Sequence, residues 1–229
     1  MQIIENIFKV LDRYGFLFIK GTGMTLAFSF IAVLGGVFFG MILTAMKSSK
    51  KIKIGNFRPL SFIATAYVEI IRGTPILLQL YVFYLWLPDA LPFLNLTKFG
   101  SISLALIFNS AAYVSEVIRA GIEAVDIGQT EAARSLGLNE AQTMIKIIIP
   151  QAIKNVLPAL CNEFIMMVKE TALASTFFAG DIMTQYKVVN GALFLVIEPL
   201  IIIGAIYFLL TFTLSKIVGI FERRLSDCD

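Results

Sequence analysis

Long runs without a charged side chain restrict the fold of this chain more than any other feature of its sequence. Residues 21–46 include no Asp, Glu, Lys or Arg, and the same holds for residues 73–88, 99–115 and 199–215. A bilayer core about 30 Å thick needs roughly 20 apolar helical residues to cross it. Of the 229 residues, 58% are hydrophobic and 15% are charged, whereas soluble domains carry roughly a quarter charged residues. The sequence therefore predicts an all-α integral membrane protein.

Five membrane spans are predicted, at about residues 22–46, 58–87, 99–120, 154–175 and 191–217. The fourth is the weakest, because Glu163, Lys169 and Glu170 interrupt it. Residues 3–19 fit either a helix lying in the membrane interface or an ordinary polar lead-in. The first apolar run is too long for the core of a signal peptide, so no cleavable signal is expected. The whole chain, 1–229, is interpreted as one transmembrane domain.

The positive residues predict the orientation of these spans, since Lys and Arg favour cytoplasmic loops. Twelve belong to the first connection, the third connection and the C-terminus: Lys47, Lys50, Lys51, Lys53, Arg58, Arg119, Arg134, Lys146, Lys154, Lys216, Arg223 and Arg224. Five belong to the opposite side: Lys9, Arg13, Lys20, Lys98 and Lys187. This asymmetry places the C-terminus in the cytoplasm and the N-terminus outside, which requires an odd number of spans.

Several functions are excluded or disfavoured by composition. The net charge of +3 is too small to suggest a nucleic-acid partner, and the chain has no histidine for a catalytic triad or a metal site. Cys161 and Cys228 lie far apart and outside any CxxC pattern, which argues against a metal or redox site. The chain also lacks the Gly-x-x-x-x-Gly-Lys phosphate loop, so it is not expected to bind ATP in that way.

The connection at about residues 121–153 is too long and too regular for a passive loop. Glu131, Ala132 and Ala133 are expected to open a short helix, and Gly137 is expected to end it in a left-handed conformation. A second set of residues then predicts another short helix. Asn139 is expected to cap it, with Gln142 completing a capping box, and Pro150 is expected to break it.

This connection resembles the EAA loop of ABC importer permeases. The matching residues are Glu131-Ala132-Ala133, Gly137 and Ile147-x-Ile149-Pro150, with isoleucine in place of the usual leucine before the proline. Further motifs resemble the polar amino acid subfamily (histidine, glutamine and arginine permeases): Gly121-Ile122-x-Ala124-Val125, Gly128-Gln129, Arg72-Gly73-Thr74-Pro75, Tyr113-x-x-Glu116-x-x-Arg119, Asn162-x-x-Ile165 and Lys169-x-Thr171-x-Leu173. Alanine stands at 172, where a small hydroxyl residue is usual. The resemblance covers about residues 21–220.

The resemblance implies the transmembrane subunit of a type I ABC importer in the cytoplasmic membrane of a prokaryote. Two permease chains, identical or paralogous, would form the pathway, and each would rest its loop on one of two ATPase subunits. An extracytoplasmic binding protein would deliver the amino acid, and alternating access would move it. This chain would bind no cofactor and would not be an enzyme, because ATP and Mg²⁺ belong to the ATPase. Glu131, Ala132, Ala133, Gly137 and Pro150 would serve the coupling to that subunit.

Charged and polar residues in the second and third spans are candidates for the substrate pathway, because charge is costly in a bilayer. Glu69 and Arg72 are spaced to pair on one helical face, either as a brace beside Pro75 or as substrate contacts. Asn109, Tyr113 and Glu116 share one face of the third span. Asn109 fits pocket lining or a helix–helix hydrogen bond about equally. Glu116 is expected to pair with Arg119 as a structural contact.

The fourth span offers both an acceptor for an ammonium group and a donor for a carboxylate. Asn162 and Lys169 share one face, and Glu163 and Glu170 share the next. Lys169 either contacts substrate or neutralises the carboxylates. Glu163 in the pathway would either favour cationic amino acids such as arginine, lysine or histidine, or hold only the α-ammonium group of the substrate. A hydroxyl stripe on the first span fits helix packing better than substrate contact: Thr22, Thr25 and Ser29.

Two other classes of protein fit the sequence less well. An ion-coupled secondary transporter also uses intramembrane carboxylates, but the inverted repeats typical of such folds are not evident, and the ordered loop has no role there. A membrane-embedded enzyme is disfavoured by the lack of histidine and of a recognisable nucleophile. Copurification with an ATPase subunit separates these interpretations.

Overall fold

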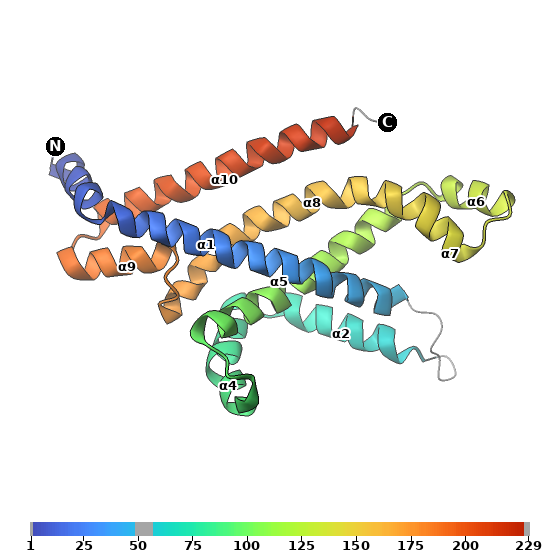
Figure 1. The fold of residues 1–229 in the computed structure, drawn as a ribbon, viewed down its shortest axis with the longest axis horizontal. Helices are drawn as coiled ribbons and strands as arrows, with labels where there is room; N and C mark the ends of the chain where they lie inside the picture. Colours follow the sequence, from blue (N-terminus) through green and yellow to red (C-terminus); the bar gives the residue numbers. More distant parts are fainter. Residues whose placement is uncertain (1, 49–56, 227–229) are drawn as a thin grey trace.

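The computed structural model describes residues 2–48 and 57–226, and the elements within them are helices. Lys50, Lys51, Lys53 and Cys228, which enter the sequence analysis, lie outside the described residues. Figure 1 shows an elongated arrangement of long helices. The helices are α1 (Gln2–Ser48), α2 (Pro59–Gly73), α3 (Ile76–Tyr81), α4 (Leu87–Ala90), α5 (Lys98–Glu123), α6 (Ile127–Ser135), α7 (Glu140–Thr143), α8 (Ile149–Glu170), α9 (Ile182–Leu193) and α10 (Ile197–Ser226). Shorter turns join them: the π turns η1 (Val82–Trp86) and η3 (Met144–Ile148), and the 3-10 turns η2 (Pro92–Leu94) and η4 (Thr171–Phe177).

Four helical stretches of the described chain are long and apolar enough to cross a membrane, and a sharply bent pair makes a possible fifth. The four contain α1, α5, α8 and α10, and the bent pair consists of α2 and the segment from α3 to α4. The prediction of an all-helical membrane protein is therefore confirmed, with four to five candidate spans.

The first predicted span is part of a much longer helix. Residues 3–19 continue without interruption into residues 22–46 as α1. The early part packs against the end of the chain, because Val10 and Phe18 are buried in a cluster with Ile182 of α9 and Ile202 of α10. This segment is therefore helical, and one of its faces packs against α9 and α10.

The second predicted span, 58–87, is broken rather than continuous. Pro75 has no N–H to continue the helix and forces the preceding Thr74 into an extended conformation (φ −117°, ψ 145°). The chain then turns by 106° before α3 and α4. The kink expected at Pro75 is thus a full break.

The third predicted span, 99–120, matches α5 closely, but the predicted boundaries of the fourth and fifth spans need correction. Pro150 does not break the helix, because it lies in the first turn of α8 directly after the π turn η3. The N–H of Ile149 reaches back to the carbonyl of Met144, and this wider turn gives the proline ring room. The fifth span begins at Ile197 rather than 191, because Phe194 adopts a left-handed conformation (φ 56°) that ends α9.

Small residues let α1 and α5 approach closely, and this pair has the most extensive helix contact in the described chain. Gly36 and Gly40 are one turn apart on α1 and face Ser110 and Val114 of α5. A Cβ at Gly36 would lie 2.5 Å from the Ser110 hydroxyl oxygen. Without a strong hydrophobic drive between membrane helices, such close packing is a main source of their association.

We therefore expect Gly36→Val to lower the thermal stability of the purified protein, because overpacking of a close contact costs about 1–3 kcal/mol. Gly23→Val is the matched control, since a Cβ at Gly23 of the same helix would meet no atom within 4 Å. Thermal unfolding of both variants in detergent measures the difference. Equal midpoints for the two would contradict the close α1–α5 contact.

Candidate transport pathway and coupling loop

The first helix of the loop between α5 and α8 starts earlier than predicted. Asp126 is the N-cap of α6, and its carboxylate accepts a hydrogen bond of 2.6 Å from the N–H of Gly128. Glu131 therefore lies in the second turn of α6 and does not open it, which corrects the prediction. Asp126, three residues after the end of α5, indicates the start of α6 better than Glu131 does, because an N-cap side chain accepts hydrogen bonds from the free backbone N–H groups of the first turn.

The loop turns at Gly137, as the sequence predicts. Gly137 has φ +85°, and its N–H donates to the carbonyl of Arg134 at 3.0 Å. The N–H of Leu138 donates to the carbonyl of Ala133 at 3.1 Å, which completes a Schellman motif. Asn139 then caps α7 in a capping box with Gln142, through two hydrogen bonds of 2.9 Å. Both local predictions are confirmed.

Exposed apolar side chains gather on this loop. Leu136, beside the turn, is 81% exposed, and Ile127 at the start of α6 is 71% exposed. A cleft of about 410 Å³ lies between α6 and the segment α7–η3, lined by Thr130, Arg134, Glu140, Thr143, Met144 and Ile148. Apolar groups exposed around a cleft are typical of a surface that binds another protein.

Glu163, in the middle of α8, faces α5 rather than Lys169. Its Oε1 accepts a hydrogen bond of 3.2 Å from the Ser110 hydroxyl. Lys169 is exposed and forms no ion pair with Glu163 or Glu170 among the described residues. The second carboxylate oxygen of Glu170 is buried without a hydrogen-bond partner in the part of the chain that the structure describes. Lys169 therefore does not hold either carboxylate through a direct ion pair.

Asn109 makes a helix–helix hydrogen bond, which is one of the two roles that the sequence left open. It is 3% exposed, and its side-chain N–H donates to Gln79 Oε1 at 2.9 Å. Gln79 in turn donates to the carbonyl of Ile71 (2.8 Å) and to the carbonyl and hydroxyl of Thr74 (3.2 and 3.0 Å). Gln79 was not among the residues predicted for the site. A polar amide side chain in the otherwise apolar run after Pro75 could have identified it.

Arg72 pairs with α5 and not with Glu69, which corrects the predicted pair. Its guanidinium nitrogen lies 3.7 Å from Glu116 Oε2, and its charge lies over the Tyr113 ring at 5.6 Å. Glu116 also pairs with Arg119 at 2.8 Å, as predicted. A further partner, Lys47 of α1, lies 2.5 Å from Glu116 Oε1 and was missed. Residue spacing along one helix cannot identify a partner on another helix.

The hydroxyl stripe of α1 serves helix packing, as expected. Thr25 is fully buried and accepts a hydrogen bond of 3.2 Å from the N–H of Ile182, at the start of α9. The neighbouring Asp181 is also fully buried and caps α9 by accepting from Met183 N–H at 3.0 Å and from the Thr184 hydroxyl. Burial raises the pKa of the Asp181 carboxyl above its ordinary value, although these hydrogen bonds act in the opposite direction.

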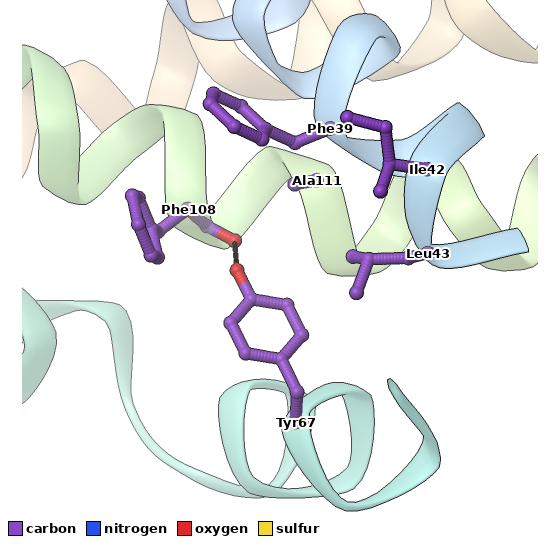
Figure 2. Close-up of a pocket in the computed structure, with 6 residues that line it drawn as sticks. All are labelled: Phe39, Ile42, Leu43, Tyr67, Phe108 and Ala111. Carbon is purple, nitrogen blue, oxygen red and sulfur yellow. Dashed lines mark hydrogen bonds between the residues drawn. The ribbon is translucent and has the colours of Figure 1, made fainter. Parts of the chain in front are cut away.

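An apolar cavity of about 130 Å³ lies where α2 meets α1 and α5 (Figure 2). Its wall consists of Phe39, Ile42, Leu43, Tyr67, Phe108 and Ala111. The Tyr67 hydroxyl points to α5 and donates to the carbonyl of Phe108 at 2.7 Å. With no free polar group facing the space, this cavity does not suit a polar substrate.

Comparison with known proteins gives consistent matches over nearly the whole chain. The family described as "Binding-protein-dependent transport system inner membrane component" matches residues 36–227. The arginine transport system permease protein ArtQ of Bacillus subtilis is 40% identical over 211 residues, covering 92% of this chain and 93% of that protein. The putative glutamine transport system permease protein GlnP of Rickettsia bellii is 42% identical over 228 residues, covering 97% and 99%. A chain in the crystal structure of an amino acid ABC transporter with histidines has a TM-score of 0.86 and 46% identity, covering 95% of this chain and 98% of that chain.

Proposed function

Because this chain belongs to the family of binding-protein-dependent transport system inner membrane components, we propose that it is the permease subunit of an ATP-driven importer for polar amino acids. The observation that carries the proposal is the loop α6–Gly137–α7, a rigidly capped pair of helices with exposed apolar side chains outside the predicted spans. Relatives with arginine and glutamine in their names support the substrate class.

The loop α6–α7 is the docking element for a cytoplasmic ATPase subunit. Leu136 and Ile127 supply apolar anchors, and Glu131, Ala132, Ala133, Gly137 and Pro150 set the shape of the segment. Two ATPase subunits and a second permease chain, identical or paralogous, complete the complex, with an external binding protein on the other side. This chain transmits the movement that ATP hydrolysis drives, and it does not hydrolyse ATP itself.

The substrate pathway lies along the exposed polar face of α8, against the second permease chain. Asn162 and Lys169 are both exposed in this single chain, and a charged side chain in a membrane helix avoids the lipid. Glu163 and Glu170 flank this face and provide acceptors for a substrate ammonium or guanidinium group. Glu69 lines a separate cleft of about 330 Å³ with Lys47 and Glu116. Glu69 contributes to the pathway if this cleft connects with the polar face of α8.

The N-terminus is external and the C-terminus cytoplasmic in this proposal. Figure 1 supports it, because the C-terminus and the loop α6–α7 lie toward the same end of the molecule, opposite the N-terminus. We expect a membrane-impermeant maleimide to label Phe93→Cys in intact cells, and Leu136→Cys only after permeabilisation. Both side chains are well exposed, at 74% and 81%, and Cys161 and Cys228 would first be replaced by serine. Labelling of Leu136→Cys from outside would reverse the topology.

Transport by the reconstituted complex tests the function. Proteoliposomes that contain the permease chains and ATPase subunits should accumulate labelled arginine, histidine or glutamine only when ATP reaches the ATPase side and the binding protein is present. The ion-coupled alternative is not favoured by the family match, and it makes the opposite prediction. Uptake that persists without ATP and stops when an ionophore dissipates the ion gradient would overturn the proposal.

A further inference from the structure

The break between α2 and α3 needs a support, because α2 buries little of its own surface. Only Ala64 and Val68 of α2 are buried among its residues. The chain turns by 106° at this break, and Gly73 beside it has open space around its Cα. After the break, Leu80 of α3 is buried in the core with Ile102 and Leu106 of α5, whereas α2 buries a smaller share of its residues and depends on contacts such as the Tyr67 hydrogen bond to α5.

After the break, Gln79 of α3 makes a contact with Asn109 of α5. Pro75 cannot donate to the carbonyl of Ile71, so that carbonyl needs another partner. The side-chain NH2 group of Gln79 provides it and also lies within hydrogen-bond distance of the carbonyl and hydroxyl of Thr74, so its two N–H groups join the chain across the interruption. Asn109 of α5 holds the remaining side-chain oxygen of Gln79 at 2.9 Å. The orientation of the Gln79 amide is therefore set from α5.

In addition to the Tyr67 hydrogen bond, contacts of Arg72 join α2 to α5 before the break. Arg72, two residues before Thr74, lies over Tyr113 and beside Glu116. Asn109, Tyr113 and Glu116 are spaced i, i+4 and i+7, so they project from one face of α5. Lys47 and Arg119 also bind Glu116, which fixes that carboxylate relative to α1 and α5. The polar face of α5 thus contacts both sides of the break.

We propose that Asn109, Tyr113 and Glu116 form a clamp on α5 that sets the angle of the broken second span and transmits movement of the loop to it. Only residues 124–126 separate α5 from α6. A displacement of α6 therefore moves α5, and the α5 clamp carries the displacement to α2 through Arg72 and to α3 through Gln79. The three side chains are positioning residues. The transmission step rests on the proposed docking of the loop, whereas the control of the angle does not.

The test measures the angle directly in the assembled complex in lipid nanodiscs. Spin labels at Ile63→Cys on α2 and Asp89→Cys on α4, both exposed positions, report the distance across the break in a background where Cys161 and Cys228 are serine. The clamp variant is Asn109→Leu with Glu116→Gln. The matched control is Ser103→Ala with Glu123→Gln, which changes the same helix and another carboxylate bound to Arg119 but leaves both sides of the break untouched.

We expect the control to keep the distance distribution of the original protein and the clamp variant to broaden it, already without ATP. Amino acid transported per ATP hydrolysed should fall about fivefold or more in the clamp variant. If that variant does not assemble, Arg72→Gln removes the contact before the break from an exposed position and should broaden the distribution alone. An unchanged distribution in the clamp variant, or in Arg72→Gln where it takes its place, overturns the proposal. If the distance distribution broadens in the clamp variant but the original complex transports no amino acid, the clamp proposal stands and the proposed substrate is wrong.

Discussion

Replacing Gly137 with valine is expected to uncouple ATP hydrolysis from transport while the chain still inserts into the membrane. Gly137 adopts φ +85° at the turn between α6 and α7, a conformation that costs a residue with a Cβ about 1–2 kcal/mol and a β-branched residue more. The strain would displace Leu136 and Leu138 and would break the two hydrogen bonds that end α6. We expect roughly a tenfold or greater loss of transport, since about 1.4 kcal/mol corresponds to tenfold in an equilibrium constant.

The control for this variant is Gly137→Asn, because asparagine tolerates the left-handed conformation better than other residues with a side chain. Copurification with the ATPase subunit and transport per ATP hydrolysed should be largely retained in Gly137→Asn and lost in Gly137→Val. A second control, Gly191→Val, changes a glycine of α9 whose Cβ would meet no atom within 4 Å. Normal coupling in Gly137→Val would contradict the assignment of the loop as the docking element.

Features that depend on neighbouring residues were predictable from the sequence. The left-handed Gly137 and the capping box of Asn139 and Gln142 follow from short-range backbone hydrogen bonding, which is local by nature. The long uncharged runs were equally informative, because the bilayer imposes a minimum helix length.

Features that depend on a partner helix were not predictable in the same way. Arg72 was expected to pair with Glu69 because their spacing allows it, but the crossing of α2 and α5 places Glu116 nearer. Pro150 was expected to end a helix, but the π turn before it provides room for the proline ring, so the helix continues. The break at Pro75 is an intermediate case. The proline predicted a disturbance, but its size depends on Gln79 and Asn109, which meet only in three dimensions.

Glu163→Gln is expected to weaken the transport of cationic amino acids about ten- to hundredfold without preventing assembly of the complex. A hydrogen bond to a charged group contributes roughly 1.5–3 kcal/mol, and a carboxylate within a membrane span needs a cation, a proton or a polar cavity. Lys169 does not lie at ion-pair distance from Glu163 in the described structure, and we propose the cationic group of the substrate as the partner of this carboxylate. Uptake of labelled arginine, compared with glutamine, measures the effect in proteoliposomes.

Ser110→Ala distinguishes two possible roles of Glu163, which are binding of the substrate by its charge and the hydrogen bond that joins α8 to α5. Ser110 donates a hydrogen bond of 3.2 Å to this carboxylate, and removal of the Ser110 hydroxyl leaves the negative charge in place. If the charge binds the substrate, Ser110→Ala should retain most arginine transport, whereas Glu163→Gln should lose it and keep basal ATPase activity. If Glu163 only joins α8 to α5, the side-chain amide introduced by Glu163→Gln can still accept from the serine, so that change should be nearly silent and Ser110→Ala the more damaging one. Equal transport of every amino acid by a stable Glu163→Gln complex would therefore exclude Glu163 from the substrate site.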